Sequence, residues 1–410
     1  MKKIRFLDKV GGIEYFNLEE GQSIKKFLKS EGIPTNAVII YKNGTIVSED
    51  KVIANANDDI EIRQVRHYDL NVTRAPKKRN FGTYEDPIYT KSVLFDDNGT
   101  MEVRKEDFQK ESYRNFVEQT FVDSVLTKDI IEANCQYIIG LSGGRDSVAF
   151  LKLLECTKHK LPNFNLTAVT VTGLPDWDEA GTFGAALKSC DLLGIEHVIV
   201  DGEAIKKHFN LNVSFAQVMT GIVSSQQNAM VMIVTHHIMR RMIEVEAEKR
   251  KVNNIFLGLN ADDLVASLVT WFTSGFNMGG IPIRNIGKFK YSFPLFQITK
   301  KELTIYLKLF ADELTKQGIP GRFTTGPDER SMAYAIGDHL YDLWPGIDYY
   351  LFEAFNNLSN YLIPKEEGCC NNCGATYANQ KNVKKLEDVC DICVLFKELG
   401  FLRAGIAAYA

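Results

Sequence analysis

The chain has 410 residues, of which 45% are hydrophobic and 24% charged, and its formal net charge is −4 at pH 7. These values are ordinary for a soluble globular protein of two or three domains. The slightly negative charge excludes a general attraction to nucleic acid or membranes, although a local basic patch can still bind either. The basic start is not followed by an apolar segment, and no run is long enough to cross a bilayer. We therefore expect a cytoplasmic protein with no signal peptide and no membrane contact.

The first 68 residues predict a small separate domain. Apolar alternation, a helical pattern that ends at Gly32 and an Asn43–Gly44 turn give the order ββαβββ. The expected elements are 3–7, 13–16, 23–30, 37–41, 45–47 and 58–62. This order resembles the β-grasp fold, and in particular the ubiquitin-like sulfur-carrier family.

The sulfur-carrier resemblance implies a chemistry that this segment lacks. Sulfur carriers expose a C-terminal Gly-Gly whose carboxylate becomes a thiocarboxylate. Here Ile62 continues into Arg63 and Gln64, and the sequence ends in Ala-Tyr-Ala. We expect a fused docking module or a structural lid, and the sequence leaves both open.

Residues 69–130 are predicted to form a linker and a helical lead-in, with helix from about residue 105. A basic stretch begins just before this segment and runs into it. Its members are Arg63, Arg66, His67, Arg74, Lys77, Lys78 and Arg79. The usual interpretation of such a stretch is a solvated linker, and the alternative is a contact with a phosphate backbone.

Residues 131–365 alternate between strand and helix patterns, which predicts an α/β domain with a doubly wound parallel sheet. Strands are expected at 137–141, 166–171, 197–201 and 255–259, and helices at 148–156, 183–193 and over most of 214–250. Sheets of this kind bind ligands at the carboxyl ends of their strands. The residues after Leu141 lie at that edge.

The segment Ser142–Ser147, with the sequence Ser-Gly-Gly-Arg-Asp-Ser, joins an apolar strand to a helix. Its two glycines allow a sharp turn and a close approach of the backbone to a ligand. The amides at the start of the helix favour an anion there. Arg145 can offset phosphate charge, and Asp146 can orient the loop or help to hold Mg²⁺. The spacing of the Walker A loop is absent.

This segment resembles the Ser-Gly-Gly-x-Asp-Ser signature of the PP-loop ATP pyrophosphatase superfamily. The resemblance implies that ATP is split to AMP and pyrophosphate. It also implies that a substrate carbonyl oxygen is adenylated, and that a nitrogen or sulfur nucleophile then displaces AMP.

A second segment, Gly258-Leu259-Asn260-Ala261-Asp262-Asp263, follows a strand. It resembles the Gly-His-Asn-x-Asp-Asp segment of tRNA 2-thiolation and TilS-like PP-loop enzymes, with Leu259 in place of the usual His. Asp262 and Asp263 are interpreted as carboxylates that bind Mg²⁺ or anchor the fold, or as caps of a helix.

The resemblance gives a set of expected site residues. The catalytic residues are Asp146, Asp263 and Arg145. The nucleotide-binding residues are Ser142, Gly143, Gly144, Asp146, Ser147, Thr170, Gly258 and Asn260.

A Pro294–Leu295 turn comes before Thr299-Lys300-Lys301-Glu302. Thr and Glu at this spacing form a capping box at the start of a helix. The same PP-loop enzymes have a Pro-Leu turn and a Lys-Glu-initiated helix here. Taken alone, this segment indicates a well-capped structural helix.

Residues 366–410 are predicted to form a zinc finger and a C-terminal tail. Cys370, Cys373, Cys390 and Cys393 form two Cys-x₂-Cys pairs separated by 16 residues, the spacing of a Cys₄ zinc site, and Cys369 is an alternative to Cys370. The residues around Cys393, together with Pro345-Gly346-Ile347, resemble the tRNA 2-thiouridine synthetase group (the TtuA and Ncs-type enzymes). Four thiolates leave no open position, so we expect a structural Zn²⁺.

The sequence also departs from that group. The group carries a Cys-x-x-Cys pair before the Gly-His-Asn segment for an iron–sulfur cluster or persulfide, whereas residues 221–228 hold no cysteine. An N-terminal paired-Cys finger is missing as well. Cys135, Cys156 and Cys190 are interpreted as structural, because buried Cys behaves as a small hydrophobe.

Three functions follow as hypotheses. The first is a sulfurtransferase that adenylates a carbonyl, on a tRNA base for example. The second is an adenylating ligase of specialised metabolism that forms an amide or thioamide on a small or carrier-bound substrate. The third is a scaffold that binds ATP without turnover, against which the intact Ser142, Asp146 and Asp263 argue. The expected cofactors are ATP, Mg²⁺ and Zn²⁺. The expected partners are a tRNA or a small or carrier-bound acceptor and an external sulfur or nitrogen donor, with a homodimer as an open option.

Overall fold

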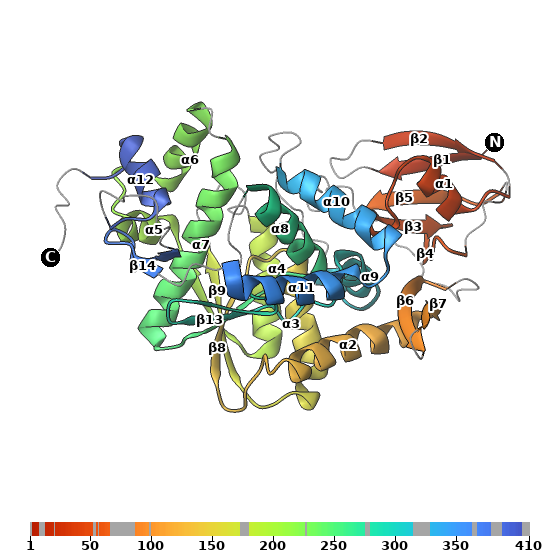
Figure 1. Cartoon of the computed structure of the whole chain (residues 1–410), viewed down its shortest axis with the longest axis horizontal. Coiled ribbons are helices and arrows are strands. Elements are labelled where there is room, and N and C mark those ends of the chain that lie inside the picture. The colour runs from red at the N-terminus through yellow and green to blue at the C-terminus, as the bar shows by residue number, and fades with distance from the viewer. Residues whose placement is uncertain are drawn as a thin grey trace.

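The computed structural model describes residues 2–7, 13–19, 21–51, 55, 57–65, 87–97, 100–172, 180–225, 228–274, 279–314, 329–362, 367–378 and 388–403. Figure 1 shows an elongated molecule, with an N-terminal sheet at one end and the cysteine-rich C-terminal segment at the other. A larger α/β unit lies between them.

The N-terminal sheet contains the predicted elements in the predicted order. Its strands β1 (Lys2–Leu7), β2 (Ile13–Leu18), β3 (Val38–Lys42), β4 (Thr45–Val47) and β5 (Ile60–Gln64) lie in the order β2-β1-β5-β3-β4. The β1–β5 pair is parallel and the other pairs are antiparallel. Helix α1 (Ile24–Ser30) and the sheet share their own core, which includes Phe6, Phe27 and Ile62. The relation to sulfur carriers stays a prediction.

The turn between β3 and β4 has the backbone conformation expected from its sequence. Asn43 and Gly44 have φ values of 52° and 82°. A two-residue type I′ hairpin requires positive φ at both positions, and Asn and Gly are the residues that accept it. A short 3₁₀ turn, η1 (Thr35–Ala37), leads into β3.

A β-hairpin follows where the sequence predicted a linker. Strands β6 (Tyr89–Asp97) and β7 (Thr100–Phe108) pair over nine residues before helix α2 (Lys110–Thr127). The strand pattern of β7 is hidden because charged residues occupy most of 102–107. Arg63 lies in β5, and the rest of the basic stretch, residues 66–79, lies outside the described residues.

The central sheet has the predicted doubly wound α/β architecture. Its strands are β8 (Gln136–Gly140), β9 (Asn165–Val171), β10 (Glu196–Val200), β11 (Asn254–Leu257), β12 (Ile283–Ile286) and β13 (Phe289–Ser292), in the order β10-β9-β8-β11-β13-β12. The first five strands in that order are parallel, and β12 is antiparallel at the edge.

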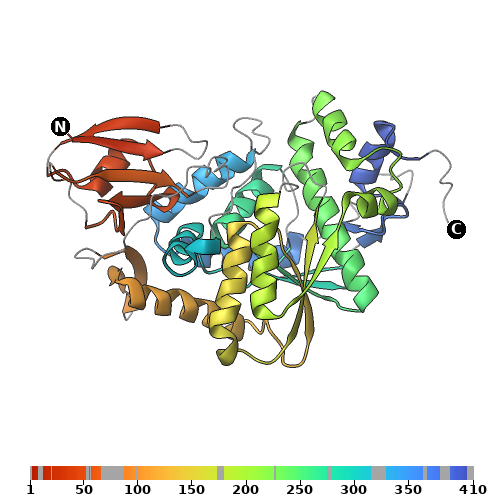
Figure 2. The same cartoon turned by 180° about the vertical axis from the view of Figure 1, so that it is seen from behind.

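Helices cover both faces of this sheet. Figure 2 shows α3 (Arg145–Thr157) and α4 (Ala180–Leu193) side by side in front of it. Helix α7 (Asn228–Arg250) packs on the opposite face, where a Cβ at Gly140 would lie 2.6 Å from Cδ1 of Ile243. The remaining helices are α5 (Gly202–His208), α6 (Phe215–Ser224), α8 (Ala261–Ser274), α9 (Lys300–Phe310), α10 (Glu329–Leu343), α11 (Ile347–Leu362) and α12 (Asp391–Glu398). Within the described ranges, none of the helices could span a bilayer.

Aromatic packing joins the sheet to α3 beneath the loop. The Tyr137 and Phe256 rings stack at 4.3 Å, and Phe150 meets Phe256 edge-on at 5.8 Å. All three side chains are buried. We expect Phe256→Ala to lower the free energy of unfolding by about 3–5 kcal/mol, because it leaves a cavity between sheet and helix. Urea denaturation checks this value, and Phe272→Ala, on a 63% exposed side chain, is the matched control with little expected change.

Candidate nucleotide site and metal centre

The segment Ser142–Ser147 lies at the carboxyl end of β8, where it turns into α3. Gly143 has a φ of 73°, a left-handed conformation that favours glycine. Gly144 is the N-cap of α3, and its amide donates to Ser142 Oγ at 3.2 Å. Ser147 Oγ donates to the Gly144 carbonyl at 2.9 Å. The amides of the first turn of α3 have no carbonyl partners within the helix, so the loop can bind an anion.

Two neighbouring strands bring predicted residues to the loop. A Cβ at Gly258, just after β11, would lie 3.4 Å from Cα of Ser147, so glycine allows close packing there. Thr170 on β9 donates its hydroxyl to the Leu141 carbonyl at 2.7 Å and lies 2.7 Å from Nε2 of His197. Burial lowers the pKa of His197, which favours a neutral ring at this contact. Thr170 therefore holds the backbone that leads into the loop.

Asp146 forms a largely buried ion pair that the sequence did not predict. Its Oδ2 accepts from Nζ of Lys300, the first residue of α9, at 2.8 Å. The side chains are 14% and 4% exposed. The other carboxylate oxygen, Oδ1, is buried and accepts no hydrogen bond from any described residue. This oxygen can take a ligand that brings positive charge or a donor.

The capping box predicted at Thr299–Glu302 is confirmed. Thr299 Oγ1 accepts from the Glu302 amide at 3.2 Å, and Glu302 Oε2 accepts from the Thr299 amide at 2.8 Å. The sequence signal for this box was clear, but the pairing of Lys300 with Asp146 joins residues 154 positions apart. Local spacing carries no signal for it.

Asn260 and Asp263 form a reciprocal cap at the start of α8. The Asp263 amide donates to Asn260 Oδ1 at 3.0 Å, and the Asn260 amide donates to Asp263 Oδ2 at 3.3 Å. The Tyr334 hydroxyl donates to the other oxygen of Asp263. Asn260 is fully buried, and its Nδ2 donates to none of the described residues. Nδ2 of Asn260 is thus available as a donor at the same edge of the sheet. The two hydrogen bonds between Asn260 and Asp263 support the interpretation of Asp263 as a helix cap.

Arg145 and Asp262 face the N-terminal unit. Nη2 of Arg145 donates to the Val65 carbonyl at 3.3 Å, just beyond β5. Asp262 accepts from Nδ2 of Asn36 at 2.7 Å and from the Lys300 amide at 2.6 Å. The loop, Gly258 and the Asp146–Lys300 pair are therefore brought together, while Arg145 and Asp262 connect them to the N-terminal unit.

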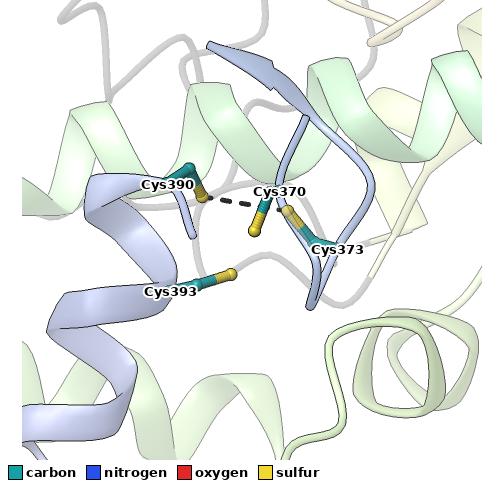
Figure 3. A group of neighbouring side chains, drawn as sticks. All are labelled: Cys370, Cys373, Cys390 and Cys393. Carbon is teal, nitrogen blue, oxygen red and sulfur yellow. Dashed lines mark hydrogen bonds between the residues drawn. The ribbon is translucent and has the colours of Figure 1, made fainter. Parts of the chain in front are cut away.

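The four predicted cysteines form a Cys₄ metal-binding site (Figure 3). Cys370 and Cys373 follow strand β14 (Glu367–Cys369), which pairs with β15 (Thr376–Ala378). Cys390 is the N-cap of α12 and Cys393 lies in its first turn. All four are buried, and their sulfurs lie within 4.8 Å of one another. Among the described residues this is the one group of three or more potential metal ligands of the Cys, His, Asp and Glu types.

Cys369 is excluded as a substitute for Cys370. Its side chain is exposed, and its Sγ lies 3.6 Å from the Gly374 carbonyl oxygen and outside the cluster. Cys190 is buried, and burial raises its pKa to about 11, which keeps it a thiol at neutral pH. This fits the structural role expected of Cys190.

Side chains of α5 and α7 hold the Cys₄ site in place. Arg241 Nε donates to the Cys373 carbonyl at 2.6 Å, and His208 Nε2 lies 2.8 Å from the same oxygen. Nε2 of His237 lies 3.6 Å from Sγ of Cys390, and Asn372 Nδ2 donates to Sγ of Cys393 at 3.3 Å. The supporting side chains of α5 and α7 were missed, because no spacing links them to the cysteines in the sequence, whereas Asn372 lies inside the first Cys-x₂-Cys pair.

The fold and the loop together define an α/β protein with the PP-loop fold. No family model matches the chain. It is 25% identical over 312 residues to a probable sulfurtransferase of Methanocaldococcus jannaschii, a match that covers 71% of this chain and 86% of the relative. It is 24% identical over 303 residues to the tRNA 2-thiolation protein NcsA of Haloferax volcanii, covering 68% and 87%.

Among solved structures, the chain is similar to the U34-tRNA thiolase NcsA from Methanococcus maripaludis with its [4Fe-4S] cluster. The TM-score is 0.52 at 24% identity, and the match covers 73% of this chain and 92% of the thiolase. The predicted resemblance to the tRNA 2-thiolation group is confirmed by these relatives.

Proposed function

We propose that this chain is an ATP-dependent sulfurtransferase that activates a carbonyl group of a tRNA base and replaces its oxygen with sulfur. The observation that carries the proposal is the Ser-Gly-Gly loop with its buried Asp146–Lys300 pair, at 2.8 Å. The relatives named as a sulfurtransferase and a tRNA 2-thiolation protein support this acceptor and this chemistry.

The loop suits an ATP molecule with Mg²⁺. Loop amides and the hydroxyls of Ser142 and Ser147 would bind phosphate, and Nδ2 of Asn260 would donate to the nucleotide. The unpartnered Oδ1 of Asp146 would hold the metal, since carboxylate oxygen is the ligand Mg²⁺ prefers. Bound Mg²⁺ would neutralise part of the negative charge on the phosphates. Thr170 would orient the backbone at Leu141, and Asp263 would orient the side chain of Asn260. Arg145 would contribute a positive charge beside the phosphates.

The reaction would run in two steps. The carbonyl oxygen attacks the α-phosphorus of ATP, and the bond to pyrophosphate breaks. A sulfur nucleophile from an external donor then attacks the carbonyl carbon, and AMP leaves with the original oxygen. The chain's own contribution is to hold the phosphates in line and to place positive charge and amides where negative charge develops.

We propose that the Cys₄ site holds one Zn²⁺ with a structural role. Thiolates bound to tetrahedral zinc at about 2.3 Å lie about 3.8 Å apart. Sγ of Cys373 and Sγ of Cys390 are 3.8 Å apart, and all four sulfurs lie within 4.8 Å. A four-iron cluster places each thiolate on a different iron and so needs wider spacing. Four thiolates fill the coordination shell of zinc and leave no position for a reactant.

Incubation of the protein with ATP, sulfide and total tRNA should yield equal amounts of AMP and pyrophosphate, and a thiolated nucleoside in digested RNA. Chromatography and mass spectrometry measure both. Absence of AMP with every tRNA pool would contradict the proposal.

A second candidate function is an adenylating amide or thioamide ligase on a small or carrier-bound substrate. One observation favours it, since residues 221–228, which lead from α6 into α7, contain no cysteine for a bound sulfur intermediate. The same assay separates the two, because transfer of ¹⁸O from a labelled carboxylate into AMP, without tRNA, would identify the ligase.

A further inference from the structure

The first turn of α9 carries three consecutive charged residues that are almost completely buried. Lys300, Lys301 and Glu302 are 3%, 4% and 0% exposed. Lysine and glutamate are rarely buried unless they are paired, because desolvation of a charge is costly. Each of the three contacts a different part of the chain, so this turn is a junction.

Lys301 connects the junction to the N-terminal unit. Its Nζ donates to Glu49 Oε1 and to the Thr35 carbonyl, both at 2.9 Å. Glu49 and Lys301 are 8% and 5% exposed at their side chains. Removal of one partner of a buried pair leaves the other charge uncompensated, so this contact fixes the N-terminal unit firmly on α9.

Glu302 connects the junction to the hairpin and α2. Its Oε1 accepts from the Tyr89 hydroxyl and from Nζ of Lys91, both at 2.9 Å, and its carbonyl accepts from the Tyr113 hydroxyl at 2.8 Å. The partners come from β6 and α2. The first turn of α9 is thus held from two sides by segments that precede the central sheet.

Lys300 connects the junction to the loop. Asn36 in turn supports Lys300 through Asp262. Asn36 Nδ2 donates to Asp262 Oδ1 at 2.7 Å and lies 3.3 Å from Oδ1 of Asp338. Asp262 Oδ2 accepts from the Lys300 amide at 2.6 Å, and Lys300 Nζ donates to Asp146 at 2.8 Å. A continuous series of hydrogen bonds therefore runs from the N-terminal unit to the ATP loop.

We propose that Asn36 is a positioning residue for the reaction, through which the N-terminal unit, held on α9 by Lys301, fixes the Lys300–Asp146 pair. The N-terminal unit then serves the ATP site in the same chain. This inference rests on the proposed function in one respect, the assignment of Asp146 to Mg²⁺ and ATP. Its physical basis is rigid coupling, because a contiguous hydrogen-bonded network transmits a displacement at one end to the other.

The test measures Mg²⁺–ATP affinity by isothermal titration calorimetry on the full chain, without an acceptor. Asn36→Ala should weaken binding roughly 2- to 30-fold, the range by which mutations along a coupling network change the affinity. The matched control is Asn43→Ala, which removes two hydrogen bonds within the N-terminal unit, with Asp58 Oδ1 at 3.2 Å and the Asp59 amide at 2.7 Å. It should lower the melting temperature and leave affinity unchanged.

A second pair of variants guards against misfolding of the single variant. Asn36→Asp places its carboxylate against those of Asp262 and Asp338 and should weaken binding, whereas Asn36→Gln keeps a side-chain amide donor and should bind more tightly than Asn36→Ala. Equal affinity of Asn36→Ala and the wild-type protein, or equal losses in Asn36→Ala and Asn43→Ala, would overturn the inference alone. Failure of the wild-type protein to bind Mg²⁺–ATP would overturn the proposed function and the inference with it.

Discussion

Lys300→Met is expected to lower the rate of pyrophosphate release by about 10²- to 10³-fold, the usual cost of losing one preorganised electrostatic contact in an active site. Methionine keeps much of the side-chain volume but removes the ammonium group that holds Asp146 at 2.8 Å. Asp146 would then be a buried carboxylate without its partner, free to turn away from the nucleotide. Steady-state pyrophosphate release with saturating acceptor measures the effect.

Lys152→Met is the matched control for this prediction. Lys152 lies on α3, the helix whose second residue is Asp146, and pairs with Glu155 at 2.9 Å, with side chains 19% and 37% exposed. A partly exposed pair of this kind contributes about 0–1 kcal/mol, so this variant should keep its activity. If Lys300→Met retained the wild-type rate while folded, the pair would be structural and the catalytic assignment of Asp146 would lose its support.

A double variant separates cooperation from independent effects. Asp146→Asn should cause a loss at least as large as that of Lys300→Met, since it breaks the same pair and also removes the proposed ligand of Mg²⁺. The combined variant should be little worse than Asp146→Asn alone, because the effects of residues in contact are not additive. If the fold-losses in rate of the two single variants multiply in the double variant, the two side chains act separately.

The sequence predicted those parts of the molecule that depend on local pattern. The apolar strand before Ser142, the two glycines after it and the capping box at Thr299 are all short-range signals, and the structure contains each of them. The Cys₄ site was predictable for the same reason, since two Cys-x₂-Cys pairs at this spacing are typical of a metal site.

Contacts between distant segments could not be predicted in this way. Lys300 pairs with a residue 154 positions away, and Asn36 bonds Asp262 across 226 positions. Buried charges such as Lys301 look like surface residues in a sequence, because their burial depends on partners elsewhere in the chain. The β6–β7 hairpin was missed because β7 is mostly charged, and its pairing with β6 decides its conformation.

Cys390→Ser is expected to abolish metal binding at the Cys₄ site and to lower the melting temperature. Cys390 is both a predicted ligand and the N-cap of α12, whose Phe396 is fully buried against Phe209. A metal present at a thousand times its dissociation constant stabilises the folded state by about 4 kcal/mol. Loss of that contribution corresponds to a melting temperature lower by roughly 8–16 °C in a domain of this size class.

Cys369→Ser is the control, because this neighbouring cysteine is exposed and lies outside the cluster. It should keep the metal and the melting temperature, whereas a strong chelator should reproduce the Cys390→Ser result in the wild-type protein. Metal analysis of the purified chain should give one zinc, and four irons would contradict the structural zinc assignment.

None of the hydrogen bonds between described residues joins the four cysteines to the loop or to Lys300. The folded Cys390→Ser variant should therefore bind Mg²⁺–ATP as the wild-type protein does, which separates a stabilising metal from a reacting one.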